Sequence, residues 1–133
     1  MMRILDSNVL IDVLRGDEHV QRTMRSHEPG ALAVPAFVRS ELVLGASLAD
    51  DGHAERFAVE AVLRPFRLLP FDERCANAHA ALHAVLQRRG SLIGIADIMI
   101  AATAIAHDAT VVTANIRDFA RVPFLRVESW RAA

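Results

Sequence analysis

The sequence of 133 residues contains no lysine, no tyrosine and a single cysteine, Cys75. One cysteine cannot form an internal disulfide, which excludes a disulfide-stapled secreted fold and suits a reducing compartment. The apolar run after Arg3 is interrupted at Asp6, too early for the core of a signal peptide. The longest apolar stretch, residues 92–106, is too short for a membrane span and contains Asp97. We therefore expect a cytoplasmic protein without a membrane-spanning segment.

An excess of charge of either sign is also lacking. The chain carries 15 arginines and 16 acidic residues, so its formal net charge is −1. No global basic field draws nucleic acid toward the molecule, which argues against a nucleic-acid substrate without excluding one. A hydrophobic fraction of 53% beside 23% charged residues excludes a disordered chain. The length fits one domain, residues 1–133, with a proper core.

Segments typical of strands and helices alternate along the chain. Strands are expected at residues 3–5, 31–34, 66–71, 110–113 and 124–127. Helices are expected through residue 14, at 18–26, from 35 to the break at 50–52, from there to about 63, at 72–89 and at 95–106. Residues 115–121 are expected to form a polar loop. This alternation predicts an α/β fold with a parallel sheet covered on both faces.

The first of these strands delivers an acidic residue. Asp6 follows the apolar run directly, and Ser7 and Asn8 come next, before the first helical face. In a parallel sheet the carboxyl ends of the strands are where ligands bind, which favours a functional role for Asp6. Asp6 or Ser7 could instead cap the helix, because both side chains accept hydrogen bonds from its unpaired N–H groups. The two interpretations are separated only by partners elsewhere in the chain.

Asp97 and Glu41 are acidic residues on helices. Asp97 lies in an otherwise apolar helix, where an ionised carboxylate is costly unless it is paired, hydrogen-bonded or bound to a metal. An ion pair with an arginine is one such solution and a metal site is another. Glu41 raises the same question, although a solvated position beside Arg39 would explain it equally well.

A second polar segment, residues 113–118, follows the strand at 110–113 much as Asp6 follows the first strand. Polar groups at two strand ends, together with acids on two helices, can converge on one cleft. Oxygen ligands of this kind suit hard cations such as Mg²⁺ or Mn²⁺. Such an ion activates water and lets an acidic pocket accept a polyanion that it would otherwise repel.

The order of these motifs resembles a known family. Asp6 in Leu-Asp-Ser-Asn-Val, Glu41 in Arg-Ser-Glu-Leu, Asp97 in Ile-Ala-Asp-Ile-Met, and Thr-Ala-Asn-Ile-Arg-Asp-Phe at 113–119 are similar to the four motifs of PIN-domain nucleases. The compact length and the closing Asn-x-x-Asp-Phe most resemble the VapC toxins of bacterial type II toxin–antitoxin pairs. The resemblance covers nearly the whole chain and implies a single PIN-like domain with a short, mostly parallel central sheet flanked by helices.

The resemblance also implies an activity. It points to a metal-dependent endoribonuclease that hydrolyses RNA phosphodiester bonds through metal-activated water and leaves a 3′-hydroxyl. Asp6, Glu41 and Asp97 take the positions that coordinate metal in the family, with Asp6 and Asp97 as the expected ligands of Mg²⁺ or Mn²⁺. A cognate antitoxin and a second copy of the chain are the expected protein partners, and both would cover apolar helix surface.

The fourth motif departs from the family pattern. Many PIN domains have a fourth acid where this chain has Asn115, and Asp118 is expected to compensate in part as a fourth catalytic acid. Thr113 is expected to orient a neighbouring carboxylate. Arg117 and Arg39 are candidate contacts to an RNA phosphate because they lie close in sequence to the site, with an ordinary surface arginine as the alternative for both.

Two other functions are compatible with parts of the sequence. A PIN-like scaffold that binds a partner without cleaving is compatible with Asn115, because this residue adds no charge to the site. A phosphotransferase could use Asp6 as a nucleophile, as phosphatases of the haloacid dehalogenase type do. Those enzymes have a second aspartate where this chain has Asn8, and the chain has no lysine to support the reaction.

Overall fold

The computed structural model describes all 133 residues, Met1–Ala133. The strands are β1 (Arg3–Leu5), β2 (Leu32–Pro35), β3 (Arg67–Leu69), β4 (Thr110–Val112) and β5 (Val127–Glu128). The α-helices are α1 (Ser7–Leu14), α2 (Glu18–Arg25), α3 (Ala36–Leu48), α4 (Gly52–Leu63), α5 (Glu73–Arg88), α6 (Ile95–Ala106) and α7 (Ile116–Phe119). A 3-10 turn, Pro29–Ala31, precedes β2.

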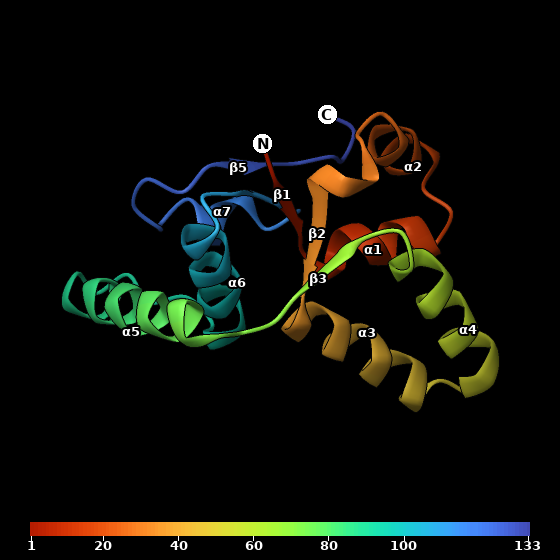
Figure 1. Ribbon diagram of the computed structural model, residues 1–133, viewed down its shortest axis with the longest axis horizontal. Coiled ribbons are helices and arrows are strands. Elements are labelled where there is room, and N and C mark those ends of the chain that lie inside the picture. The colour runs from red at the N-terminus through yellow and green to blue at the C-terminus, as the bar shows by residue number, and fades with distance from the viewer.

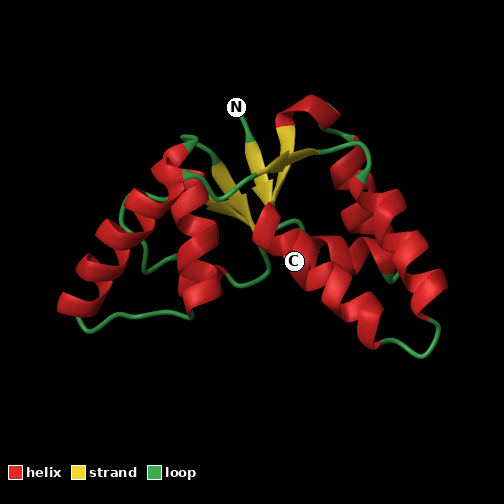
Figure 2. Cartoon of the chain, turned by 60° about the horizontal axis from the view of Figure 1, so that its bottom comes forward, coloured by secondary structure: helices red, strands yellow, loops and turns green.

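All five strands are parallel and lie in the order β3-β2-β1-β4-β5. The chain builds the sheet outward from β1 to β3 and then returns to add β4 and β5 on the other side of β1. Helices α1 to α4 lie on one side of the sheet, and α5 and α6 lie on the other (Figure 1). The strands stand between two groups of helices (Figure 2). The predicted α/β class is confirmed.

The burial of the sheet explains why the strands are short apolar runs in the sequence. Ile4, Leu5, Val111 and Val112 are fully buried, because helices cover both faces of the parallel sheet. Helix α6 is buried from Ile98 to Ala104 apart from Met99, and it packs mainly against α5 and also against β4. No helix in the chain combines the length and hydropathy that a membrane span requires.

Most helix boundaries agree with the predicted residue ranges. Asp17, Asp51 and Asp72 are N-cap residues, and each side chain accepts a hydrogen bond from a backbone N–H in the first turn of α2, α4 or α5. Gly16 ends α1 with a φ of 86°, in the left-handed region that favours glycine. Local cap chemistry therefore fixes where these helices begin and end.

Two predictions near the C-terminus are wrong. The last strand is Val127–Glu128 rather than residues 124–127, because pairing with β4 begins only at Val127, opposite Val111. Phe124 is fully exposed at a φ of 61°, outside any strand. The predicted loop at 115–121 contains the short helix α7, whose turn carries Phe119 into the core with no exposed surface.

Candidate active site

Asp6 lies at the carboxyl end of β1, between that strand and β4. Its backbone N–H donates to the carbonyl oxygen of Val112 at 2.9 Å, and the residue is 4% exposed. Its Oδ1 accepts a hydrogen bond from the backbone N–H of Ser7 at 2.7 Å, so Asp6 does cap α1. Capping uses one carboxylate oxygen and leaves Oδ2 for other partners.

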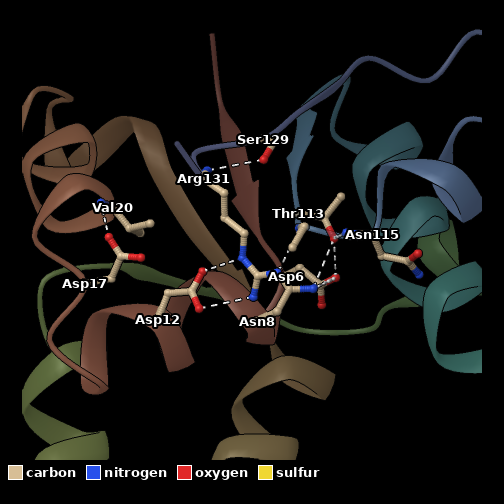
Figure 3. A network of polar contacts seen from close by, with 10 residues as sticks. Asp6, Asn8, Asp12, Asp17, Val20, Thr113, Asn115, Ser129 and Arg131 are labelled. Atoms are coloured by element: carbon tan, nitrogen blue, oxygen red, sulfur yellow. Dashed lines mark hydrogen bonds and ion pairs between the residues drawn. The ribbon is translucent and has the colours of Figure 1, made fainter. Parts of the chain in front are cut away.

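Thr113 and Asn8 hold that second oxygen (Figure 3). The Thr113 hydroxyl donates to Asp6 Oδ2 at 2.8 Å, and the Asn8 amide donates to the same oxygen at 3.3 Å. The Asn8 Oδ1 accepts from the backbone N–H of Ala114 at 3.0 Å, which ties the start of α1 to the segment after β4. Thr113 therefore orients a carboxylate, as its position in the sequence suggested, and Asn8 is a supporting residue that the sequence did not reveal.

Asn115 joins Asp97 to Asp118. Its Nδ2 donates to Asp97 Oδ2 and to Asp118 Oδ2, each at 3.1 Å. A carboxylate only accepts hydrogen bonds, so two carboxylate neighbours fix the amide with its NH₂ group toward them. Asp97 makes no ion pair with an arginine and lies in the first turn of α6, where the helix dipole favours a negative charge.

Glu41 enters the same region from α3. The residue is half-buried, and its Oε1 is buried without any hydrogen-bond partner. Burial raises the pKa of Glu41, and the charges of Asp6 and Asp97 raise it further, while the Ser7 hydroxyl opposes the shift. The alternative that Glu41 is a solvated residue on the helix surface is therefore wrong.

The acidic side chains influence one another although they come from four separate segments. Burial raises the pKa of Asp97, as do the charges of Asp6 and Asp118, and the hydrogen bond from Asn115 acts in the opposite direction. No arginine or histidine contributes to the pKa shift of Glu41 or Asp97. This edge of the sheet is therefore a concentration of negative charge without a basic partner from the chain.

The donor set fits a hard divalent cation. An orphaned, buried carboxylate oxygen on Glu41 and the mutual repulsion of Glu41, Asp97 and Asp6 are features that a cation relieves. As the side chains stand, no three acidic, histidine or cysteine residues are grouped closely enough to hold an ion. Asp97 and Asp118 share the Asn115 amide in this arrangement.

The two arginines considered from the sequence have different surroundings. Arg117 is exposed on α7 between Asn115 and Asp118 and makes no ion pair. Arg39 lies two residues from Glu41 but pairs with Glu60 of α4 at 2.5 Å. Only Arg117 therefore stays a candidate for a phosphate contact at the acidic site.

A second feature in Figure 3 fixes the far end of α1. Arg131, close to the C-terminus, pairs with Asp12 through both carboxylate oxygens, at 2.9 Å from Nε and 3.2 Å from Nη2. Asp12 lies one turn after Asn8 on the same face of α1. The C-terminal segment thus holds the helix whose first turn carries Ser7 and Asn8.

Comparison with known proteins agrees with this fold. A family model of the PIN domain matches residues 3–125, and the chain therefore belongs to the PIN-domain family. Within that family the similarity extends over the whole length of VapC-type proteins, which confirms the resemblance seen in the sequence. Ribonucleases with this domain are generally dependent on divalent metal ions.

Three relatives illustrate the similarity. A ribonuclease VapC2 of Rickettsia felis is 28% identical, over 98% of each chain. The toxin FitB of Neisseria gonorrhoeae is 33% identical over 89% of this chain and 91% of its own. The crystal structure of DNA-bound VapBC from Salmonella typhimurium superposes with a TM-score of 0.93 at 27% identity, covering 98% of this chain and 99% of that chain.

Proposed function

We propose that this protein is a metal-dependent endoribonuclease and acts as the toxin of a type II toxin–antitoxin pair. The observation that carries the proposal is the convergence of Asp6, Glu41, Asp97 and Asp118 at the end of β1 and β4, with no basic residue to neutralise them. Relatives named ribonuclease VapC2 and toxin FitB, similar over nearly the full chain, support the choice of RNA as substrate and of toxin as role.

Asp6 and Asp97 are the residues that would hold the ion, and Mg²⁺ or Mn²⁺ is the ion that their oxygens suit. When bound, the ion supplies positive charge to the phosphodiester and lowers the pKa of water. Thr113 and Asn8 keep the Asp6 carboxylate in one orientation. Asp118, held beside Asp97 by the Asn115 amide, adds negative charge on the far side of the site.

Glu41 is the residue suited to accept a proton. Its Oε1 has no partner and its pKa is raised, which brings it closer to the range in which a carboxylate works as a general base. In the step we propose, the oxygen of water bonds to phosphorus and its proton passes to Glu41. The bond from phosphorus to the 3′-oxygen breaks, and that oxygen takes up a proton from a solvent water molecule and leaves as a 3′-hydroxyl. Arg117, which is exposed on α7 between Asn115 and Asp118, would contact a phosphate of the RNA.

The partners follow from the same comparison. We propose that a cognate antitoxin covers the protein, as the similarity to the VapBC structure suggests, and that two copies of the chain form a homodimer in the cytoplasm. Exposed leucine and phenylalanine side chains on α3 and α4, Leu44, Leu48 and Phe57, are apolar surface that such partners would cover.

The experiment that tests the proposal is cleavage of a cellular RNA pool by purified protein freed of antitoxin. Reactions with Mg²⁺, Mn²⁺ or a chelator are compared for the wild type and for Asp6→Asn and Asp97→Asn proteins whose folding has been verified. We expect discrete products with either ion that disappear with the chelator and in both variants. Identical RNA patterns in every reaction would contradict the proposal.

One observation favours a non-cleaving binding module as second candidate. The Asn115 amide occupies oxygens of both Asp97 and Asp118, where a fourth acid would compete for the ion. Retained ion binding without RNA cleavage would single out this function. The phosphotransferase alternative is disfavoured, because Asn8 stands where phosphatases of the haloacid dehalogenase type have a second aspartate and the chain has no lysine.

A further inference from the structure

Two hollows meet at Phe66, just before the edge strand β3. The first has a volume of about 170 Å³ and the second of about 210 Å³. The first is lined by Val34, Arg39, Glu60, Leu63, Arg64, Phe66, Arg67 and Leu68. The second is lined by Met24, Arg25, His27, Pro29, Leu32, Pro65 and Phe66. We call these two hollows together the Phe66 groove.

The groove is basic although the chain as a whole is not. Glu60 is its only acid, and Arg39 and Arg56 both pair with that carboxylate. Arg25 and Arg64 are exposed and make no ion pair. In a protein with a net charge of −1, this leaves a local surplus of positive charge beside an aromatic ring.

The walls of the groove suit a planar apolar group with an anionic neighbour. Phe66 is only partly buried, and leucine, valine and proline side chains complete the walls. Each hollow is smaller than the roughly 300–1,000 Å³ of a site for a drug-sized ligand, so each fits one flat group rather than a whole cofactor. Unstacked RNA bases bind aromatic faces, and arginine binds the phosphates between them.

The groove and the acidic site lie on opposite sides of the first turns of α3. Arg39 lines the groove and Glu41 faces the acidic site, and residues two apart on a helix point about 200° apart. Arg25, Arg64 and Phe66, by contrast, precede β2 and β3 and lie toward the amino ends of these strands, whereas Asp6 lies at the carboxyl end of β1. An RNA strand that joins the two sites therefore passes along the length of the strands, which rise about 3.3 Å per residue, so several nucleotides separate the sites.

We propose that the Phe66 groove binds single-stranded RNA several nucleotides away from the cleaved bond, with a base against Phe66 and phosphates on Arg25 and Arg64. The proposal rests on the ribonuclease function proposed above, and it adds the Phe66 groove as a second surface that contacts the RNA substrate. Arg67 lies on the edge strand β3 itself, where a substitution could also disturb strand pairing with β2. Arg25, Arg64 and Phe66 are therefore the residues to test.

The test measures binding of a labelled single-stranded RNA by fluorescence anisotropy, with Mg²⁺ present and in an Asp97→Asn background, so that no cleavage is needed. Arg25→Gln/Arg64→Gln removes two charges from the groove. Arg88→Gln/Arg89→Gln is the matched control, because both arginines are exposed and unpaired at the end of α5. Phe66→Leu keeps an apolar side chain for packing and removes the aromatic face.

We expect Phe66→Leu to weaken binding about fivefold or more, the lower limit for the loss of one stacked base. Arg25→Gln/Arg64→Gln should reduce the slope of log affinity against log salt by about 1.4, since each single-strand phosphate contact contributes about 0.7. The control pair should change affinity by less than about twofold. In addition, RNA carrying a photoreactive base should crosslink near Phe66.

An equal loss of RNA affinity in Arg25→Gln/Arg64→Gln and in Arg88→Gln/Arg89→Gln would overturn the inference, because it would indicate non-specific attraction between RNA and any surface arginine. So would unchanged RNA binding together with weaker binding of a polyglutamate peptide by the groove pair, which would indicate an acidic protein partner. Wild-type cleavage of RNA with no effect of the groove variants contradicts this inference alone. Groove-dependent RNA binding without wild-type cleavage contradicts the ribonuclease proposal instead.

Discussion

At the scale of single residues, the site depends on neutral groups that hold carboxylates. Thr113 and Asn8 fix Asp6, and Asn115 holds Asp97 together with Asp118. Neutral donors of this kind favour the ionised carboxylate without cancelling the charge that a cation needs. Their removal should therefore affect both RNA cleavage and stability.

Replacing Thr113 with valine preserves shape and removes the hydroxyl that donates to Asp6 and accepts from the Asn115 backbone. We expect RNA cleavage to fall about 10- to 100-fold, as for other groups that orient ligands. Stability should fall by about 1–3 kcal/mol, measured by urea unfolding, because buried polar partners lose their bond. Thr103→Val is the control, since that hydroxyl donates to the Met99 carbonyl of its own helix and to none of the four acids. Equal cleavage by the wild type and Thr113→Val would contradict the role of Thr113.

Replacing Asn115 with aspartate tests the bridge between Asp97 and Asp118. The change removes both donated hydrogen bonds and places a third carboxylate between two others. In chelator we expect a lower melting temperature than that of the wild type, equivalent to about 1–3 kcal/mol for the lost bonds. With Mn²⁺ the variant should recover more stability than the wild type does. Asn77→Asp on the exposed face of α5 should show neither effect, and melting curves of Asn115→Asp that match the wild type would refute the bridge.

At the scale of secondary-structure elements, the boundaries that could be predicted are those with local chemical signals. Glycine, proline and aspartate mark α4, α5 and α6, and the predicted ranges agree with the observed ones. The last strand could not be predicted from residues 124–127, because its bounds depend on pairing with β4 rather than on local propensity. The same limit applies to Asn8, whose partners Thr113 and Ala114 lie more than 100 residues away in the chain.

The short strand β5 is tied to the sheet by Glu128. Its Oε1 accepts from Arg3 of β1 and from the Trp130 indole N–H, and Trp130 stacks on His27 at a ring distance of 5.1 Å. Burial raises the pKa of Glu128, but the hydrogen bonds from Arg3 and Trp130 outweigh burial and lower it overall. A carboxyl group with a lowered pKa stabilises the folded state when it is ionised.

Glu128→Gln should therefore reduce stability by about 1 kcal/mol near neutral pH, a modest value because the ion pair is partly exposed. The stabilisation is present above the ordinary glutamate pKa, about 4.3, and is lost as the pH falls through the lowered pKa of the folded protein. Urea unfolding of the wild type and the variant at neutral and acidic pH measures the difference. A destabilisation of the same size at both pH values would show that the charge of Glu128 does not matter.

At the scale of the whole molecule, the topology explains where the site lies. The chain runs from β1 toward β3 on one side and returns to β4 on the other, so β1 and β4 flank the point where the strand order reverses. Ligands of open parallel sheets bind at such a point, and Asp6 is anchored there by its bond to Val112. The sequence predicts this placement, because Asp6 and Thr113 each follow a buried strand.

The charge distribution is the other whole-molecule feature. A near-neutral chain concentrates unpaired acids at one edge of its sheet, so folding alone leaves the carboxylates of Glu41 and Asp97 unfavourably charged, as their raised pKa values indicate. A carboxyl group with a raised pKa destabilises the folded state when it is ionised, above its ordinary pKa. Removing one such charge should raise the stability of the ion-free protein and lower the stability of the ion-bound protein.

The most direct measurement is the melting temperature of the wild type and of Asp97→Asn at neutral pH, in chelator and with Mn²⁺. We predict that Asp97→Asn melts at a higher temperature than the wild type in chelator, because it removes a partly buried charge and relieves the repulsion by Asp6 and Asp118. With Mn²⁺ the order should reverse, since an ion at 100 times its dissociation constant stabilises the wild type by about 2.7 kcal/mol and the variant far less. An Asp97→Asn protein that is less stable in chelator and gains as much from Mn²⁺ as the wild type would contradict a cation site built from these acids.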